Sequence, residues 1–267
     1  IEVVRGSHST IYGTSDIGGV VNIITKKANK AGISGNASLQ AGTFGSGTSD
    51  FSQNLSLNYM TESGFYLGGE IMNRNVDGLD ATLDTITNPN TFKNRDKDGF
   101  DKLDWVGRVG YRGKKLDIFA SYKNTEQTTD LDDGAYRDDP NHTSRLNRDL
   151  ISYGASYDLN DKWQLKANGG YTYLSRLIED LPSVIDADGN TDLTYSINDA
   201  EGTILNNELQ LAYQSAKISG IFGLGNYQED MTQYNYFFSD GIFGPFVSES
   251  NLDDFNLQNT INSAFLH

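Results

Sequence analysis

Apolar and polar residues alternate along most of the chain after residue 32. In the segment Ile151–Leu159, apolar side chains occupy every second position and the positions between them are small or polar. Strict alternation places one set of side chains on each face of an extended strand. The same pattern recurs in nine further segments: Ile33–Ala41, Phe51–Tyr59, Phe65–Ile71, Leu103–Tyr111, Leu116–Tyr122, Trp163–Tyr173, Leu205–Tyr213, Ile218–Leu224 and Phe255–Phe265. The sequence therefore predicts about ten strands.

The length of these segments favours a membrane barrel over a soluble sandwich. Soluble strands usually run about 5–6 residues, whereas transmembrane barrel strands alternate over about 10 residues. Barrel strands carry apolar side chains toward lipid and polar side chains toward the lumen. We therefore expect Ile151, Tyr153, Tyr157, Trp163, Leu165 and Tyr171 to face lipid, and Ser152, Gln164, Lys166 and Asn168 to face the lumen.

The connections between these segments alternate in length. Short turns are predicted at Thr61–Gly64, Arg112–Lys115, Asn160–Asp161 and Ser215–Lys217. Long polar loops are predicted at about 77–100, 127–148, 179–202 and 232–253. Outer-membrane barrels have short periplasmic turns and longer extracellular loops. Tyr and Trp residues also gather near the predicted strand ends, where barrels carry aromatic girdles.

Composition excludes several other classes of protein. The chain has 267 residues with 28 Gly and 15 Tyr but only 4 Pro, which suits strands because proline removes a hydrogen-bond donor from a sheet. The net charge of −15 disfavours nucleic acid as a partner, since phosphate contacts need clustered Lys and Arg. No cysteine is present, which excludes disulfides, thiol catalysis and zinc-thiolate sites. No apolar run approaches the roughly 18 residues of a membrane helix.

No catalytic constellation is visible in the sequence. The three histidines, His8, His142 and His267, lie far apart along the chain. The many Asp and Glu residues fall mostly in predicted loops, whereas a glycosidase pair needs a defined cleft. We therefore expect that the chain is not an enzyme.

The first 27 residues, IEVVRGSHSTIYGTSDIGGVVNIITKK, form a dense motif of turn residues followed by an apolar strand. This stretch resembles the end of the plug domain of TonB-dependent outer-membrane receptors, which has the form I-E-V-x-R-G-P-x-S-x-L-Y-G-x-x-A-I-G-G-V-I-N-I-I-T-K. The departures are Ser7 for Pro, Ile11 for Leu, Asp16 for Ala and Val21 for Ile. The matching plug-motif residues include Arg5, Gly6, Ser9, Tyr12, Gly13, Gly18, Gly19 and Asn22.

This resemblance implies a fold and a division of the chain. The fold class is all-β: about ten strands of a larger transmembrane antiparallel β-barrel, preceded by the C-terminal end of a plug domain. Residues 1–27 would belong to the plug and residues 28–267 to the N-terminal part of the barrel. Receptors of this kind close about 22 strands around the plug. We therefore expect the chain to be an internal piece of a receptor, without the segment that contacts TonB.

Charged contacts between plug and barrel are also implied by the resemblance. Arg5 lies in the plug motif, and Glu70 and Glu208 have lumen-facing parity on their predicted strands. An Arg–carboxylate pair between them would be bidentate and specific. The other interpretation is that Arg5 covers backbone carbonyl groups within the plug.

One acidic loop resembles a calcium site. Asp186, Asp188, Asn190 and Asp192 alternate along the chain as the oxygen ligands of a calcium loop do, but the Glu expected at the twelfth position is missing. The hypothesis of calcium binding stands beside the simpler one of a solvated acidic loop. We expect no other cofactor.

The resemblance implies uptake of a scarce nutrient across the outer membrane of a Gram-negative cell, by a multi-pass barrel energised through TonB. The small ligand would be an iron–siderophore complex, cobalamin, haem or an oligosaccharide, and calcium in the loops would favour cobalamin. The expected partners are TonB, this ligand and outer-membrane lipid. A passive porin or an adhesin on the same barrel is the alternative from another functional class.

Overall fold

The computed structural model describes residues 2–5, 19–22, 30–45, 47–79, 97–132, 139–184, 191–241, 244–251 and 257–267. Every regular element within these ranges is a β-strand. Eleven strands form one antiparallel sheet, and two short hairpins form separate two-stranded sheets. The hairpins are β1 (Glu2–Arg5) with β2 (Gly19–Asn22), and β10 (Ser183–Val184) with β11 (Thr191–Asp192). The predicted all-β antiparallel architecture is confirmed.

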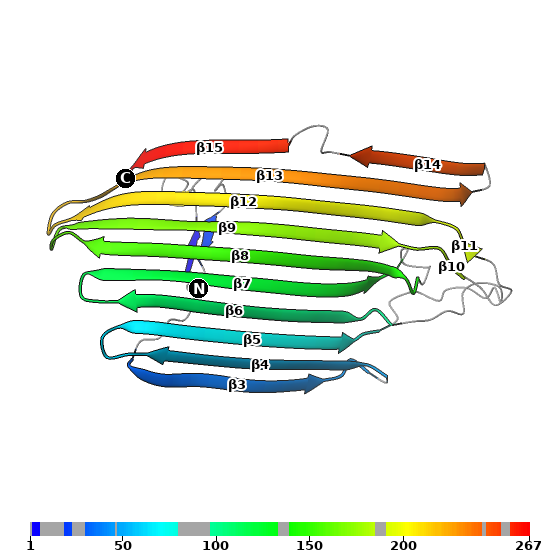
Figure 1. Cartoon of the computed structure of the whole chain (residues 1–267), viewed down its shortest axis with the longest axis horizontal. Coiled ribbons are helices and arrows are strands. Elements are labelled where there is room, and N and C mark those ends of the chain that lie inside the picture. The colour runs from blue at the N-terminus through cyan, green and yellow to red at the C-terminus, as the bar shows by residue number, and fades with distance from the viewer. Residues whose placement is uncertain are drawn as a thin grey trace.

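The main sheet is an up-and-down meander in which chain neighbours are also sheet neighbours (Figure 1). Its strands are β3 (Gly32–Gly42), β4 (Ser49–Met60), β5 (Phe65–Asp77), β6 (Phe100–Arg112), β7 (Leu116–Leu131), β8 (His142–Asp158), β9 (Trp163–Asp180), β12 (Tyr195–Gln214), β13 (Ser219–Gly241), β14 (Gly244–Asn251) and β15 (Leu257–Leu266). β14 and β15 both pair with β13, one after the other along the same edge. The short turns lie at one end of the sheet and the longer connections at the other.

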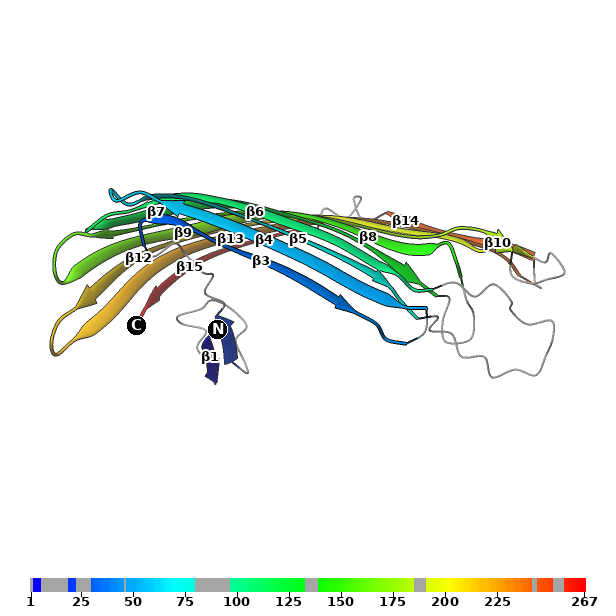
Figure 2. The same cartoon turned by 90° about the horizontal axis from the view of Figure 1, so that it is seen from below.

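The sheet is curved and open (Figure 2). One face is convex, and the β1–β2 hairpin lies on the concave side. Among the described residues, β3 pairs with β4 alone, and β14 and β15 pair with β13 alone. A barrel closes only when its first and last strands pair. The described strands therefore form a curved wall with two open edges.

The predicted short turns are confirmed, but several strands are longer than the alternation of apolar and polar residues predicted. The turns after β4, β6, β8 and β12 lie where short connections were predicted, and in the last of them the Ser215 amide donates to the Ile218 carbonyl at 2.8 Å. The predicted loops 127–148, 179–202 and 232–253 are partly strand in the structure. β8 already begins at His142, β12 begins at Tyr195, and β13 continues to Gly241. Both faces of these strand ends carry many polar residues, so hydrophobic alternation fades while backbone pairing continues.

β15 carries most of its large apolar residues on the concave face, although Leu266 pairs with Phe222 on the convex face. Leu257 and Phe265 point to the concave face, whereas Thr260 and Asn262 point to the convex face, as their pairing with β13 requires. The ring of Phe265 lies over Gly223, where no side chain competes for the space. The register changes between the two strands: Asn251 at the end of β14 pairs with Tyr234 on the convex face, whereas Leu257 at the start of β15 pairs with Met231 on the concave face.

The tight turn between β4 and β5 depends on Gly64. Its φ of +97° lies in the region that favours glycine, and a Cβ there would collide with the backbone carbonyl of Arg112 on β6. We predict that Gly64→Ala destabilises the folded protein by about 1–3 kcal/mol. The measurement is the temperature at which the folded form loses its fast mobility on a denaturing gel.

Gly107→Ala is the matched control, because no atom lies within 4 Å of a Cβ placed at Gly107. That variant should unfold at the wild-type temperature. Equal behaviour of the two variants would mean that the turn does not need a glycine.

Candidate functional site

The convex face carries the side chains that were predicted to face lipid. Tyr157 pairs with Leu165 and Ile151 with Tyr171, so these residues share one face. The predicted set is 37–44% exposed and comprises Ile151, Tyr153, Tyr157, Trp163, Leu165 and Tyr171. Ser152, Gln164, Lys166 and Asn168 point to the concave face by the same register. The predicted alternation on β8 and β9 is confirmed.

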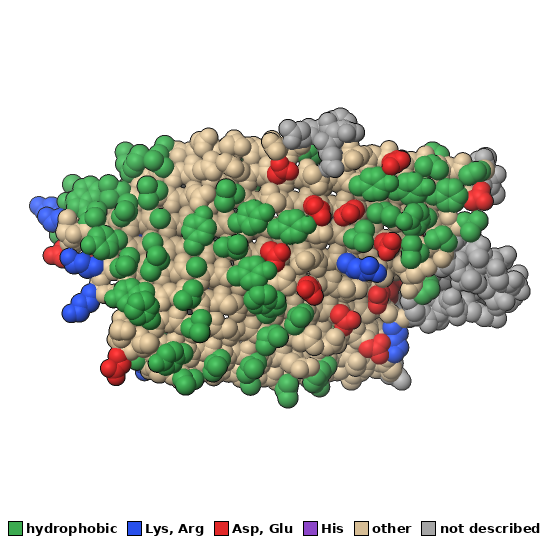
Figure 3. Space-filling model, in the orientation of Figure 1, with side chains coloured by type: hydrophobic (Ala, Val, Ile, Leu, Met, Phe, Trp, Pro, Cys, Tyr) green, Lys and Arg blue, Asp and Glu red, His purple; other side chains and the backbone are tan. Residues whose placement is uncertain are grey.

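These residues belong to an apolar belt that crosses the convex face diagonally (Figure 3). On β4 the outward residues Phe51, Leu55, Leu57 and Tyr59 are 41–59% exposed, so the belt reaches the loop end of this strand. On β13 its last outward apolar residue is Leu224, near the short turn. A diagonal belt is expected when strands tilt across a level layer, because each strand meets the layer at a different residue.

Aromatic pairs mark the short-turn edge of this belt. The rings of Phe65 and Tyr111 have centroids 4.7 Å apart, beside the turn between β4 and β5. Trp163 and Tyr213 make a second pair at 4.7 Å, beside the short turns that follow β8 and β12. Such tilted ring pairs suit the quadrupoles of aromatic side chains. This is the placement that an interfacial girdle requires.

The concave face holds nearly all the cations of the main sheet. Of the nine Lys and Arg residues on its described strands, Arg145 alone points to the convex face. The carboxylates are divided differently, with eight on the concave face and eleven on the convex face. The eight concave cations are Arg74, Lys102, Arg108, Arg112, Lys123, Arg148, Lys166 and Arg176.

Some of these cations are held by carboxylates on neighbouring positions. Arg74 donates to both oxygens of Asp50, with Nε–Oδ1 3.0 Å and Nη2–Oδ2 2.7 Å. This two-point geometry fixes the orientation of the guanidinium group. Asp104 is 9% exposed and lies 3.3 Å from Lys102 Nζ and 3.5 Å from Lys123 Nζ. The hydroxyl of Thr125 also donates to Asp104 at 2.5 Å, so this buried carboxylate is well compensated.

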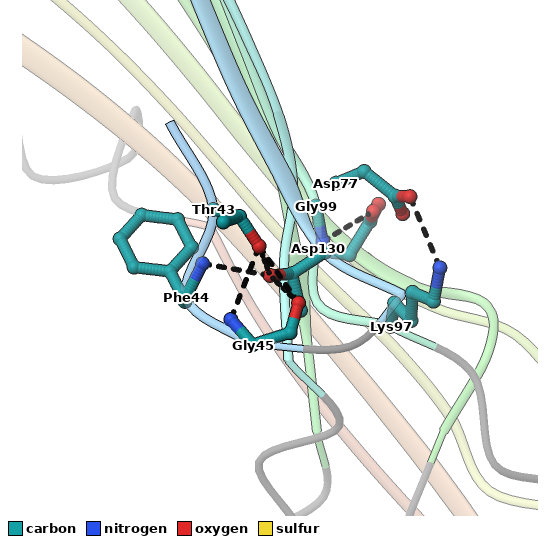
Figure 4. Close-up of polar contacts among 8 residues, drawn as sticks. Thr43, Phe44, Gly45, Asp77, Lys97, Gly99 and Asp130 are labelled. Atoms are coloured by element: carbon teal, nitrogen blue, oxygen red, sulfur yellow. Dashed lines mark hydrogen bonds and ion pairs between the residues drawn. The ribbon is translucent and has the colours of Figure 1, made fainter. Parts of the chain in front are cut away.

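The loop end of the wall is tied together by further polar contacts (Figure 4). Lys97 Nζ lies 3.0 Å from Asp77, and the Gly99 amide donates to Asp130 at 3.0 Å. The Thr43 hydroxyl donates to the Gly45 carbonyl at 2.7 Å in the connection after β3. The Lys97–Asp77 and Gly99–Asp130 contacts hold the outer ends of β5, β6 and β7 together, whereas the Thr43 bond orders the connection after β3.

Aromatic and cationic groups pack together at the short-turn end of the concave face. Tyr66 is 4% exposed, and the guanidinium of Arg112 lies 5.9 Å from its ring centroid. Arg112 Nε also donates to Asp117 at 3.0 Å. The Tyr66 hydroxyl is buried and has no hydrogen-bond partner among the described residues. This part of the wall is densely packed around the buried Tyr66 hydroxyl.

The predicted plug–barrel pair stays a prediction. Glu70 accepts a hydrogen bond from Asn54 Nδ2 at 2.6 Å, and Glu208 accepts one from Gln210 Nε2 at 2.6 Å. Both carboxylates point to the concave face, as their parity predicted. Arg5 ends β1 opposite Gly19, and its side chain lies outside the described part of the chain.

The plug motif is described only in part. Gly19 and Asn22 lie on β2, where Asn22 pairs with Glu2. The other motif residues except Arg5 lie outside the described residues: Gly6, Ser9, Tyr12, Gly13 and Gly18. The division into residues 1–27 and 28–267 also stays a prediction.

The predicted calcium ligands fall mostly outside the described residues. These are Asp186, Asp188 and Asn190, which separate β10 from β11 in the sequence. Asp192 lies on β11 and pairs with Ser183. Within the described ranges, no group of three or more Asp, Glu or His residues could hold a metal ion. Calcium binding therefore stays a prediction.

Of the concave cations, only Lys166 was assigned to the lumen side from the sequence. Sequence reasoning singled out Glu70 and Glu208 but gave no role to Arg148 or Arg176, which have the same parity as Ser152 and Gln164 on their strands. The parity of charged residues along each alternating segment was the signal that could have found them. The described residues also contain no helix that is long and apolar enough to cross a membrane.

Comparison with known proteins places this wall among solved structures. The sequence matches no family model and no curated protein. The crystal structure of the unliganded ferric citrate transporter FecA matches with a TM-score of 0.63 at 15% identity, over 93% of this chain and 37% of that chain.

Two further receptors match in the same way. A mutant of the ferric enterobactin receptor PfeA of Pseudomonas aeruginosa matches with a TM-score of 0.55 at 15% identity, over 93% of this chain and 45% of that one. The ferric yersiniabactin uptake receptor FyuA of Yersinia pestis matches with a TM-score of 0.52 at 12% identity, over 99% of this chain and 48% of that one. The chain thus spans less than half the length of these structures. It has the fold of the barrel wall of TonB-dependent receptors, as the resemblance of its first 27 residues implied.

Proposed function

We propose that this chain is part of an outer-membrane receptor that takes up iron bound to an organic chelator, with energy delivered through TonB. The observation that carries the proposal is the diagonal apolar belt on one face of a curved wall, with eight of the nine strand cations on the other. The three matched structures are named as receptors or transporters for ferric citrate, ferric enterobactin and ferric yersiniabactin. They support a ferric complex as the ligand class.

The height of the belt supports a membrane position. On β4 the belt runs from Phe51 to Tyr59, which are 41% and 49% exposed. Nine residues of strand extend about 30 Å, and a tilt of about 40° reduces this to roughly 23 Å of height. Transmembrane barrels carry an outward apolar band about 25 Å tall. The short turns would then lie on the periplasmic side and the long connections outside the cell.

The concave wall beyond the belt offers cations to an anionic ferric complex. On β8 the convex face changes from Ile151 to Asp149, which marks the outer limit of the belt. Arg148 lies next to this limit but points to the concave side, and on β9 Arg176 Nη2 donates to Asn198 at 3.1 Å. Guanidinium groups bind carboxylate and similar anionic oxygens in a two-point geometry. Calcium-dependent affinity through Asp186 and Asp188 would instead favour cobalamin.

The membrane position predicts alternate labelling on β8. The chain has no cysteine, so single cysteines can be introduced at Ile151, Ser152, Tyr153 and Gly154 of the full receptor. A lipid-soluble maleimide should label positions 151 and 153 and leave 152 and 154 largely unlabelled, because successive side chains point to opposite faces. Mass spectrometry measures the labelled fraction. Equal labelling of all four positions would exclude a lipid-facing convex surface.

The proposed function predicts energised uptake of iron. Iron-starved cells that carry the full receptor should accumulate radioactive iron supplied as ferric citrate, enterobactin or yersiniabactin. Deletion of TonB or addition of a protonophore should abolish accumulation, because TonB couples these receptors to the proton-motive force. Uptake that persists without TonB would identify a passive porin, and absence of uptake for all complexes would redirect the search to cobalamin, haem or sugars.

The two faces of β8 provide a matched pair of variants. We predict that Arg148→Gln lowers the affinity for the transported ferric complex about tenfold, since hydrogen bonds to charged groups contribute about 1.5–3 kcal/mol. Arg145→Gln removes the same charge from the same strand on the convex face and should leave affinity unchanged. Titration of the purified receptor with the ferric complex measures both values. Equal losses in the two variants would mean that the ligand does not approach the concave wall at this level.

A further inference from the structure

A second apolar cluster lies on the convex face, near the loop ends of β12, β13 and β14. We call it the distal aromatic patch. The pairings Tyr195–Phe238, Ile197–Tyr236 and Phe238–Val247 make its members direct neighbours. The rings of Tyr195 and Tyr236 have centroids 5.6 Å apart, and Val247 is 54% exposed. Figure 3 shows apolar side chains gathered at this end of the same strands, away from the belt.

Lipid does not explain this patch. The belt ends on β13 at Leu224, and Tyr236 lies twelve residues further along the strand. Twelve residues extend about 40 Å, which leaves roughly 30 Å of height above the belt at a tilt of about 40°. The outward positions between them include the polar Asn226, Gln228 and Asp230. An exposed apolar patch outside the hydrocarbon marks a surface that contacts another molecule.

The border of the patch is acidic. Glu179, Asp199, Asp240 and Glu249 occupy outward positions around it. The hydroxyl of Tyr234 donates to Glu249 at 3.1 Å, so this part of the border is ordered. No Lys or Arg shares these outward positions on the described parts of β9, β12, β13 and β14.

The charge of the border decides between possible occupants. A second copy of the chain would bring the same carboxylates against these, and like charges in an interface cost several kcal/mol. The phosphates of the outer leaflet would be repelled for the same reason, and a neutral sugar would leave the carboxylates without counter-charges. A protein surface with an apolar centre and a basic border satisfies both parts of the patch.

We propose that the distal aromatic patch is a docking surface for a second protein whose apolar contact surface is bordered by Lys and Arg. Aromatic residues carry most of the binding free energy at protein interfaces, which suits Tyr236 and Phe238 as central anchors. The surrounding carboxylates attract the basic partner and set its orientation. The proposal depends on the proposed function only for the membrane position of the belt.

The first experiment finds what lies on the patch in living cells. The photocrosslinking residue p-benzoylphenylalanine replaces Tyr236 in the full receptor, and in the control it replaces Tyr171 in the belt. After illumination, position 236 should give one discrete protein adduct, identified by mass spectrometry, that position 171 does not give.

The second experiment measures the chemistry of the contact with the identified protein, purified. Tyr236→Ala should weaken its binding to the receptor at least tenfold, and Tyr171→Ala should leave binding unchanged. Glu179→Gln combined with Glu249→Gln should weaken binding severalfold at about 50 mM salt and much less at about 500 mM salt, because salt screens exposed charges. Each variant must keep the fast gel mobility of the folded receptor.

Several outcomes would overturn the proposal. These are an adduct of twice the receptor mass, an adduct with lipopolysaccharide, no adduct beyond the control, or binding that ignores the Gln replacements at low salt. Failure of the proposed membrane position has a different signature. In that case the lipid-soluble maleimide would not distinguish positions 151 and 152, whatever the crosslinking at position 236 shows.

Discussion

The continuous ladder of backbone hydrogen bonds is the interaction on which this structure depends. Within the described residues, Tyr66 is the one hydrophobic side chain that is buried, so the sheet has no apolar core of the kind that holds a soluble domain. β12 and β13 pair without interruption from Tyr195–Phe238 to Gln214–Ser219. In a membrane, every backbone donor and acceptor must be paired within the protein. Long antiparallel strands pair these backbone groups whatever side chains they carry. The side chains on both faces can therefore serve other functions.

The two faces are used differently because lipid and lumen make different demands. In the proposed membrane position, the convex face buries its apolar belt against hydrocarbon, which accepts side chains such as Leu57 and Trp105 but no charge. The concave face holds cations next to carboxylates, as in the Arg74–Asp50 pair, which suits the water-filled lumen of the proposed barrel. The cations that are paired with carboxylates, such as Arg74, have their orientation fixed within the wall. Arg148 and Arg176, near the outer limit of the belt, are better placed to receive an anionic ligand.

The length of the strands gives the convex face a third region. β13 has 23 residues, about twice what is needed to cross the hydrocarbon layer. In the proposed membrane position, its outer half stands in a different environment from its inner half, although the same backbone ladder continues through both. The acidic residues and the distal aromatic patch lie on this outer half. In the proposed membrane position, β13 thus presents a lipid-facing and then a water-facing surface along its length.

The sequence by itself determined the strand class, the four short turns and the faces of β8 and β9. These features could be predicted because the alternation of apolar and polar residues in the segments around Ile151 and Leu165 is a local pattern. It depends only on the two-residue period of an extended chain. The motif from Arg5 to Asn22 also implied the receptor fold, through its resemblance to the end of a plug domain. The outer halves of the strands escape detection because alternation fades there, so the pattern predicts a loop where β14 lies and starts β12 ten residues too late.

Only the tertiary structure decided which distant residues meet. The distal aromatic patch joins Tyr195, Tyr236 and Val247, which no local pattern connects. The diagonal course of the belt and the reversed faces of β15 likewise follow from the register between strands. Register is set by the pairing of whole strands, and a shift of one residue would move every side chain to the opposite face. For that reason the sequence could predict the faces of each strand but not the surfaces that the strands build together.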